Sequence, residues 1–281
     1  MNQNNPHIQQ IDNLPVRLKK PFDLEFIHQY GKVFKVFDDQ DSGNLCFGVT
    51  KGDHRYFVKF AGAPTYPYQG NPRDAITRLK EAEPIYRDLA HPSLIKLVDA
   101  GPAGDGFVLV FEWVDAICAH PMYPQDHRRF LQLPLGTKLG IFHDVLEFHG
   151  HVAEKGYVAI DFYDGSIMWD PANRRTVICD IDFYRPSPAV GSENLWGSPR
   201  FLSPEEHTPG ARVDEVTNVY TMGATAFALF SDSDRSRESW PLNPRLYDLA
   251  TSATSPDRAT RPQSIRQFQA EWRIRLASGQ T

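Results

Sequence analysis

Cysteine is scarce in this chain of 281 residues, which has only Cys46, Cys118 and Cys179. An odd number of widely spaced cysteines, with no CxxC pair, argues against a disulfide framework and against a zinc site. The three thiols are therefore expected to be reduced, as is usual in the cytosol. We accordingly predict a cytoplasmic location.

Long apolar runs and an excess of positive charge are also missing. No stretch reaches the roughly 18 apolar residues of a membrane helix, and the polar start MNQNNPHIQQIDN does not have the pattern of a secretion signal. The net charge of -5 lacks the basic footprint of a nucleic-acid-binding protein. The sequence thus predicts no membrane or nucleic-acid partner, and it leaves the oligomeric state open.

The chain does contain enough apolar residues, 41%, to bury a large core in one domain or two lobes. Residues 1–21 are interpreted as a polar N-terminal tail. Alternating or β-rich patterns then predict strands at residues 31–37, 44–50, 55–60, 94–99 and 106–113. Between them, a helix is expected to start at Asn71-Pro72, and Pro84 should kink it or end it.

The second part of the chain is mainly helical. Helical spacing or a long apolar run predicts helices at residues 137–155, 216–230, 241–254 and 263–277. Two short strands are expected at 167–169 and 176–179. A small β-rich lobe at residues 22–113 followed by a helical lobe at 114–281 is a bilobal α+β arrangement.

Lys59 lies in an otherwise apolar strand, where its ammonium group is costly unless it has a partner. The plainer alternative is an edge-strand lysine that faces water. The partner carboxylate would come from the following helix. Spacing from the apolar residues that follow places Glu81 on the inward face, and spacing from those that precede places Glu83 there; we favour Glu81.

Three aspartates lie in apolar surroundings in the second part. Asp161 follows a long helix and a turn, and Asp180 and Asp182 end an apolar strand about 20 residues later. Carboxylate oxygens in this setting are suited to Mg2+. The alternative is that they cap backbone N–H groups in loops.

Four short segments give these residues a family context. Residues 197–205 read GSPRFLSPE, residues 218–223 read NVYTMG, residues 91–95 read HPSLI, and residues 261–262 read RP. Over roughly residues 25 to 275 the chain resembles the eukaryotic-like serine/threonine protein kinases of bacteria, whose motifs H-P-N-I-V, G-T-P-x-Y-M-A-P-E, D-V-Y-S-L-G and R-P occur in this order along the chain. The resemblance implies a bilobal kinase fold and an ion pair between Arg261 and Glu205.

The same resemblance implies ATP and Mg2+ as cofactors, with Mn2+ as an alternative, and a protein or peptide substrate. Lys59 would hold the α- and β-phosphates and Glu81 would orient it. Asp161 would accept or orient the hydroxyl proton of the substrate. Asp182, or else Asp180, and Ser166 would bind the metal.

The nucleotide would be held mainly by the first lobe. By the resemblance, Gly43 belongs to the loop that covers the phosphates. Phe111 corresponds to the gatekeeper, and backbone groups of Glu112 and Val114 would hold adenine.

The sequence departs from the family pattern mostly at the active site. The H-R-D motif reads Ala159-Ile160-Asp161, and its following lysine and asparagine are Tyr163 and Ser166. D-F-G reads Asp182-Phe183-Tyr184, and the aspartate of the buried helix is Asn218.

The phosphate loop also departs from the family pattern. It keeps one glycine, Gly43, and carries Asp38, Asp39 and Asp41, which would repel phosphate unless they point away. Three functions therefore stay open. The chain is a divergent serine/threonine protein kinase, a pseudokinase that binds without turnover, or a small-molecule kinase of the aminoglycoside or choline type. We favour the first.

Overall fold

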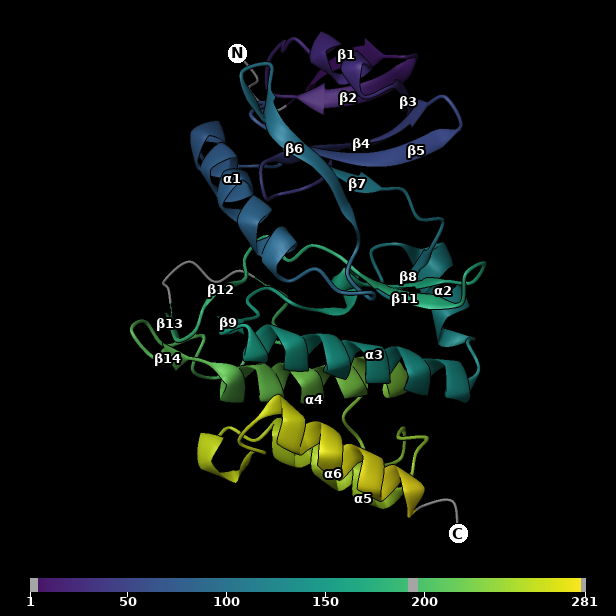
Figure 1. Cartoon of the computed structure of the whole chain (residues 1–281), viewed down its shortest axis with the longest axis vertical. Coiled ribbons are helices and arrows are strands. Elements are labelled where there is room, and N and C mark those ends of the chain that lie inside the picture. The colour runs from purple at the N-terminus through teal and green to yellow at the C-terminus, as the bar shows by residue number, and fades with distance from the viewer. Residues whose placement is uncertain (1–4, 192–196, 279–281) are drawn as a thin grey trace. The chain divides into compact units, whose positions relative to one another are not determined.

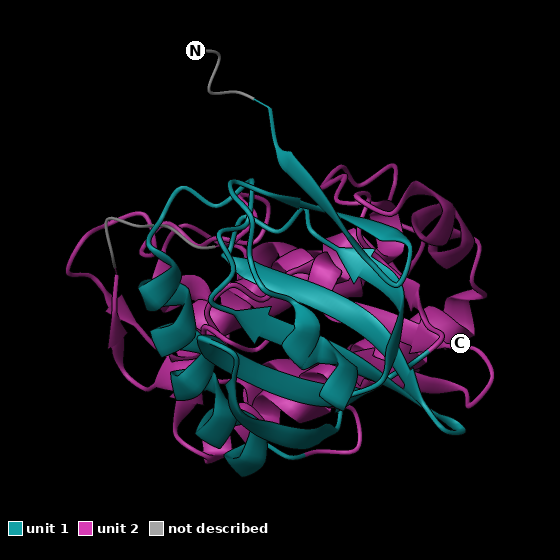
Figure 2. Ribbon diagram, turned by 90° about the horizontal axis from the view of Figure 1, so that it is seen from above, with its two compact units in different colours: residues 1–90, 95–114 teal, residues 91–94, 115–281 magenta. Residues whose placement is uncertain are grey.

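The structure is a computed structural model that describes residues 5–191 and 197–278 (Figure 1). The chain forms two compact units, which Figure 2 colours separately. Unit 1 contains residues 1–90 and 95–114, and unit 2 contains residues 91–94 and 115–281. The sequence predicted a division after residue 113. Within the described residues, no helix is both long and apolar enough to cross a membrane.

Unit 1 is built on an antiparallel five-stranded sheet with the order β3-β4-β5-β7-β6. Its strands are β3 (Lys32–Phe37), β4 (Asn44–Lys51), β5 (His54–Ala61), β6 (Leu97–Ala103) and β7 (Gly106–Glu112). A short 3-10 helix, η1 (Glu25–Gln29), precedes β3. One helix, α1 (Pro72–Asp88), packs against β5 and β7, as Figure 1 shows.

Helix α1 begins where the sequence predicted. The Asn71 side chain accepts a hydrogen bond from the Arg73 N–H, and Pro72 occupies the first turn. The prediction that Pro84 could end the helix is wrong, since α1 continues to Asp88. Pro84 is exposed, so the backbone carbonyl that loses its partner lies on a face that water reaches.

The prediction of a polar tail at residues 1–21, of which residues 1–4 lie outside the described part of the chain, is also wrong. Residues 7–18 form a hairpin of β1 (His7–Ile11) and β2 (Leu14–Leu18). Asp12 and Asn13 make its two-residue turn with φ of 48° and 66°, values that Asp and Asn tolerate better than other side chains. Ile11, Val16 and Leu18 are buried in the core of unit 1. The polar composition hid this hairpin because its outward positions carry Gln, Pro and Arg.

Unit 2 is mostly helical. Its helices are α2 (Pro124–Leu131), α3 (Leu135–Glu154), α4 (Glu215–Ser231), α5 (Pro244–Ala253) and α6 (Ile265–Ala277), with the 3-10 turns η2 (Asp164–Ser166) and η3 (Arg258–Thr260). A three-stranded sheet has the order β11-β10-β8, formed by β11 (Arg175–Ile178), β10 (Ile167–Asp170) and β8 (Ile117–Cys118). Two further antiparallel pairs join β9 (Tyr157–Val158) to β12 (Arg185–Pro186) and β13 (Ala189–Val190) to β14 (Arg212–Val213).

Helix α4 is the centre of unit 2. It packs against α3, α5 and α6 and is buried along most of its length, as its apolar sequence predicted. A capping box starts it, because the Asp214 carboxylate accepts from the helix N-terminus and the Thr217 hydroxyl accepts from the Asp214 N–H. This helix is the rigid support for the loops described below.

The buried hairpin makes a testable prediction about stability. Leu18→Ala should lower the free energy of unfolding by about 2–4 kcal/mol, because it empties a fully buried position. Ile8→Ala in the paired strand, where the side chain is 59% exposed, should change it by no more than about 0.5 kcal/mol. Urea unfolding of both variants measures the difference. Equal stability of the two variants would show that residues 7–18 behave as a tail.

Candidate active site

The predicted site residues fall into two groups, one in each unit. In unit 1, Lys59 lies on β5, the middle strand of the sheet, opposite Cys46 of β4 and Leu109 of β7. Its residue is 8% exposed. The alternative of an edge-strand lysine that faces water is therefore wrong.

Gly43 ends the loop between β3 and β4 in a conformation that requires glycine. Its φ is +85°, and an added Cβ would lie 2.8 Å from the Tyr68 ring and 2.9 Å from the Cβ of Ala75. The loop thus packs closely against helix α1 and the segment before it. A larger residue at position 43 would force them apart.

The inward face of helix α1 is not where the sequence placed it. Its buried residues are Ala75, Leu79, Ala82, Ile85 and Tyr86. Glu81 is exposed, and Glu83 forms an exposed ion pair with Arg87 at 3.0 Å. The placement of Glu81 on the inward face is therefore wrong, because the position that faces inward between the two glutamates is Ala82.

The segment predicted to be the gatekeeper and hinge runs from the end of β7 to the end of unit 1. Phe111 is buried, and its ring lies 4.8 Å from that of Tyr86 on α1. The Glu112 N–H donates to the Lys96 carbonyl at 3.1 Å. Glu112 would therefore contact adenine through its carbonyl rather than its N–H, and the adenine contacts of Glu112 and Val114 stay a prediction.

In unit 2, Asp161 is presented by a loop that α4 holds in place. The Asn218 carboxamide accepts from the Ala159 N–H at 2.8 Å and donates to the Ala159 carbonyl at 2.7 Å. Both residues are buried. Asp161 then adopts φ of +62°, a left-handed conformation that few side chains accept. Gly197, the first residue of the GSPRFLSPE segment, packs against Asp161, since an added Cβ would lie 3.3 Å from its Oδ1.

Of the two predicted metal ligands, Ser166 lies where β10 and β11 meet, and Asp182 follows β11. The Ser166 carbonyl accepts from the Cys179 N–H at 3.0 Å, at the edge of the β10–β11 ladder that leads into residues 180–182. Ser166 is fully buried, yet among the described residues its Oγ has no hydrogen-bond partner. Asp182 is 4% exposed. An unbonded buried hydroxyl is costly unless a ligand uses it, and a hydroxyl oxygen is a ligand that Mg2+ accepts. Metal binding by Ser166 and Asp182 stays a prediction.

Tyr163 stands where the family has a lysine, and it lies among acidic groups. Burial raises the pKa of its phenol, and the charges of Asp180 and Asp161 raise it further. The hydroxyl therefore keeps its proton. Tyr163 offers a neutral hydrogen-bond donor beside these carboxylates, where lysine would offer a cation.

Tyr184, which replaces the flexible glycine of D-F-G, is fully buried and bonded to helix α3. His149 Nδ1 lies 2.8 Å from the Val145 carbonyl, which can only accept, so Nδ1 carries the proton. Nε2 then accepts from the Tyr184 hydroxyl at 2.9 Å. Burial lowers the pKa of His149 to about 4, which keeps the ring neutral.

The predicted ion pair between Arg261 and Glu205 is confirmed. The guanidinium donates to both carboxylate oxygens, at 2.7 and 3.0 Å, and its side chain is fully buried. Arg258 adds a bond to Glu205 at 2.6 Å and one to Asp214 at 2.6 Å. The end of the GSPRFLSPE segment is thus tied to the start of helix α4.

Sequence reasoning missed one ion pair in the loop that carries Asp161. Asp164 is buried, and Arg200 pairs with it at 2.8 Å. Arg200 also donates to the Ser233 hydroxyl at 2.7 Å. No periodic pattern identifies this pair, although an arginine inside the GSPRFLSPE segment was a signal that a carboxylate should lie nearby.

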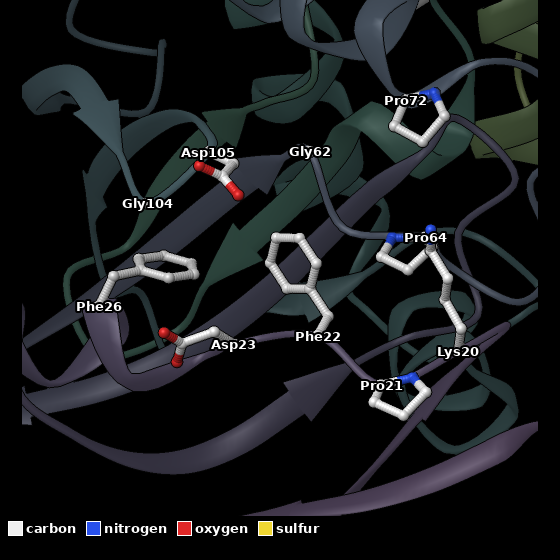
Figure 3. A pocket seen from close by; sticks show the side chains of 10 residues that line it. All are labelled: Lys20, Pro21, Phe22, Asp23, Phe26, Gly62, Pro64, Pro72, Gly104 and Asp105. Carbon is white, nitrogen blue, oxygen red and sulfur yellow. The ribbon is translucent and has the colours of Figure 1, made fainter.

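A pocket of about 490 Å³ lies inside unit 1, away from the residues predicted to hold nucleotide (Figure 3). Its wall includes Phe22, Phe26 and Asp23 from the segment after β2, together with Asp105 and Lys20. Neither Lys59 nor Gly43 lines it. This pocket is therefore not the predicted nucleotide site.

Comparison with known proteins identifies the fold. No protein-family model matches the sequence. Serine/threonine-protein kinase pkn2 of Myxococcus xanthus is 24% identical over 162 residues, which are 55% of this chain and only 19% of that relative's length. Crystal structures of the Mycobacterium tuberculosis PknI kinase domain and of its double mutant have TM-scores of 0.62 and 0.61, at 19% and 18% identity. They cover 88% and 87% of this chain and 95% of each domain.

The chain therefore has the bilobal α+β protein kinase fold. Among such proteins, the likeness is to the bacterial eukaryotic-like serine/threonine kinases, as the sequence predicted.

The Asn218 bonds can be tested by local hydrogen exchange. Asn218→Ala leaves two buried backbone groups of Ala159 unpaired, so it should cost about 2–4 kcal/mol and speed amide exchange at residues 159–163. Asn243→Ala is the matched control, since the Asn243 side chain also accepts from one backbone N–H and donates to one carbonyl. The control should leave exchange at residues 159–163 unchanged. Equal exchange in both variants would contradict the anchoring role.

His149 makes a prediction about pH. Its pKa is about 4 in the fold and ordinarily 6.5, so the unfolded chain binds the extra proton first as pH falls. Stability should therefore be full above pH 6.5 and fall by up to roughly 1.4 kcal/mol per pH unit between pH 6.5 and 4. His149→Gln should flatten this slope. A smaller dependence of stability on pH should remain, because burial also lowers the pKa of His91.

The control for this prediction is His143→Gln, an exposed position on the same helix. It should keep the wild-type slope in urea unfolding between pH 4.5 and 7. If His149→Gln keeps the full slope as well, the buried neutral histidine is not its source.

Proposed function

We propose that this chain transfers the γ-phosphoryl group of ATP to a serine or threonine hydroxyl of a protein or peptide. The observation that carries the proposal is the placement of Asp161, a carboxylate in a left-handed turn whose preceding peptide group is fixed by Asn218. Phosphoryl transfer depends on positioning and on electrostatic stabilisation more than on covalent chemistry. A rigidly held carboxylate in the protein kinase fold is suited to it.

Each remaining role follows from the chemistry of the side chain. Lys59, on the central strand, would hold the α- and β-phosphates. Asp161 would orient the substrate hydroxyl and accept its proton. Asp182 and the Ser166 hydroxyl would bind magnesium, which would neutralise charge on the phosphates. No glutamate of α1 would orient Lys59, because Ala82 takes the inward position between Glu81 and Glu83.

Tyr163 would limit the rate of phosphoryl transfer. A neutral phenol in place of lysine can donate a hydrogen bond to a phosphate oxygen, but it adds no positive charge to stabilise the transferring group. The chain would therefore transfer phosphate slowly. The same observation favours the second candidate, a pseudokinase that binds nucleotide without turnover.

The third candidate is a small-molecule kinase. The bidentate pair of Arg261 with Glu205 argues against it, because that pair holds the segment which protein kinases use beside a peptide substrate. All three cysteines are thiols rather than disulfides, which supports the cytoplasmic location that we propose.

Phosphoryl transfer should be visible directly. With γ-labelled ATP and either Mg2+ or Mn2+, the purified chain should label itself or a serine- and threonine-containing peptide mixture. Asp161→Asn should lower the rate by about 10²–10⁴-fold, because the amide cannot accept the proton. Label counting after gel separation measures this.

The matched control is Asp248→Asn, which changes an exposed carboxylate on α5 and should keep the wild-type rate. Nucleotide binding without label in either metal would establish the pseudokinase. Label on aminoglycosides or choline but not on peptides would establish the small-molecule kinase.

A further inference from the structure

The loop at residues 38–43 is fastened at its start by the N-terminal hairpin. The Arg17 N–H donates to Asp38 Oδ2 at 2.7 Å, and the Arg17 guanidinium donates to Oδ1 at 2.6 Å through Nη2 and to both oxygens at 3.1 Å through Nε. The Asp38 side chain is 13% exposed and that of Arg17 is 45% exposed. A pair that combines main-chain and side-chain donors fixes the direction of the carboxylate, unlike a single surface contact.

The hairpin that carries Arg17 is itself firmly placed. Asp12, in its turn, accepts from the Val33 N–H at 2.7 Å, at the start of β3. Its end is bound too, since the Lys19 N–H donates to the Pro64 carbonyl at 2.8 Å. Together with buried Val16 and Leu18, these bonds attach the turn of the hairpin to β3 and its end to the segment after β5, and Figure 1 shows β2 beside β3.

The far end of the same loop is held by helix α1. Arg78 Nη2 donates to the Ser42 carbonyl at 2.5 Å, and Gly43 lies against Tyr68 and Ala75. The loop is therefore anchored at both ends from within unit 1. What lies between the anchors is the exposed pair Asp39 and Asp41.

The ion pair of Arg17 with Asp38 matters because of the negative charge on Asp38. Like charges repel each other more strongly near a protein surface than in bulk water, so a carboxylate turned toward a phosphate weakens its binding. Burial tends to raise the pKa of Asp38, but the bonds from Arg17 outweigh it and lower the pKa below its ordinary value. The carboxylate is thus ionised and its charge is balanced by the hairpin.

We propose that Arg17 is a positioning residue of the nucleotide site: it turns Asp38 toward the N-terminal hairpin, which allows a loop with one glycine and three aspartates to cover the phosphates of ATP. This inference rests on the proposed function. It assigns to residues 7–18 a part in nucleotide binding, through the loop rather than by contact with the ligand.

The test compares the dissociation constant for fluorescent ATP in Mg2+ at low salt. Arg17→Ala should weaken binding about three- to tenfold, because Asp38 is released with its charge. Asp38→Ala and the double variant Arg17→Ala/Asp38→Ala should bind within about twofold of the wild type, since the repelling charge is gone. In 0.5 M NaCl the effect of Arg17→Ala should shrink. Arg237→Ala, which breaks an exposed pair in unit 2, is the control.

A double variant that binds as weakly as Arg17→Ala would overturn the proposal, as would Asp38→Ala alone with a tenfold loss. Hydrogen exchange without nucleotide separates this result from failure of the proposed function. Arg17→Ala should speed exchange of amides 38–43 several-fold, while Arg237→Ala should not. If the wild type binds no ATP, the proposed function fails and the nucleotide role of Arg17 fails with it. Unchanged exchange in Arg17→Ala rejects the anchor itself.

Discussion

Two hydrogen bonds join the Asn218 carboxamide to the N–H and the carbonyl of Ala159, and they tie the loop that carries Asp161 to α4, the most buried helix of unit 2. A carboxylate could accept from the N–H but could not donate to the carbonyl, so asparagine suits this peptide group where the family has aspartate. The left-handed turn at Asp161 follows two residues later, so the bonds at Ala159 also fix its position. The Thr217 hydroxyl of α4 donates to Glu205, the partner of Arg261, at 3.0 Å, so α4 holds both this loop and the segment at residues 197–205.

The guanidinium of Arg200, near this loop, has a structural role. Arg200 lies in the segment at residues 197–205 but pairs with buried Asp164, and removal of Arg200 would take the guanidinium partner from a buried carboxylate. It therefore does not replace the lysine that the family has at Tyr163. Tyr184 adds a further restraint, since its hydroxyl is bonded to a neutral histidine inside unit 2. The site is built for fixed geometry, with less electrostatic stabilisation than the family pattern would supply.

How far the sequence predicted the molecule depended on the range of each signal. The sheet of unit 1, helix α4 and the pair of Arg261 with Glu205 were predicted because each has a strong local pattern or a specific motif. The inward face of α1 was not predicted correctly. Each residue turns a helix by about 100°, and the apolar residues before and after the two glutamates indicated different inward faces. Ala82, between Glu81 and Glu83, offers no side chain that would have indicated the answer.

The N-terminal hairpin shows that a residue which conflicts with a predicted function can have its explanation in a distant segment. Three aspartates in a phosphate loop oppose the function that the surrounding motifs favour, and nothing within the loop resolves it. The partner of Asp38 lies 21 residues earlier, in a segment that composition alone assigns to a tail. Alternation of Ile11, Val16 and Leu18 across an Asp-Asn turn was the signal available, and it was weak because only three buried side chains carry it. A departure from a family motif therefore has to be judged with the elements that contact it, because a second departure elsewhere can compensate for it.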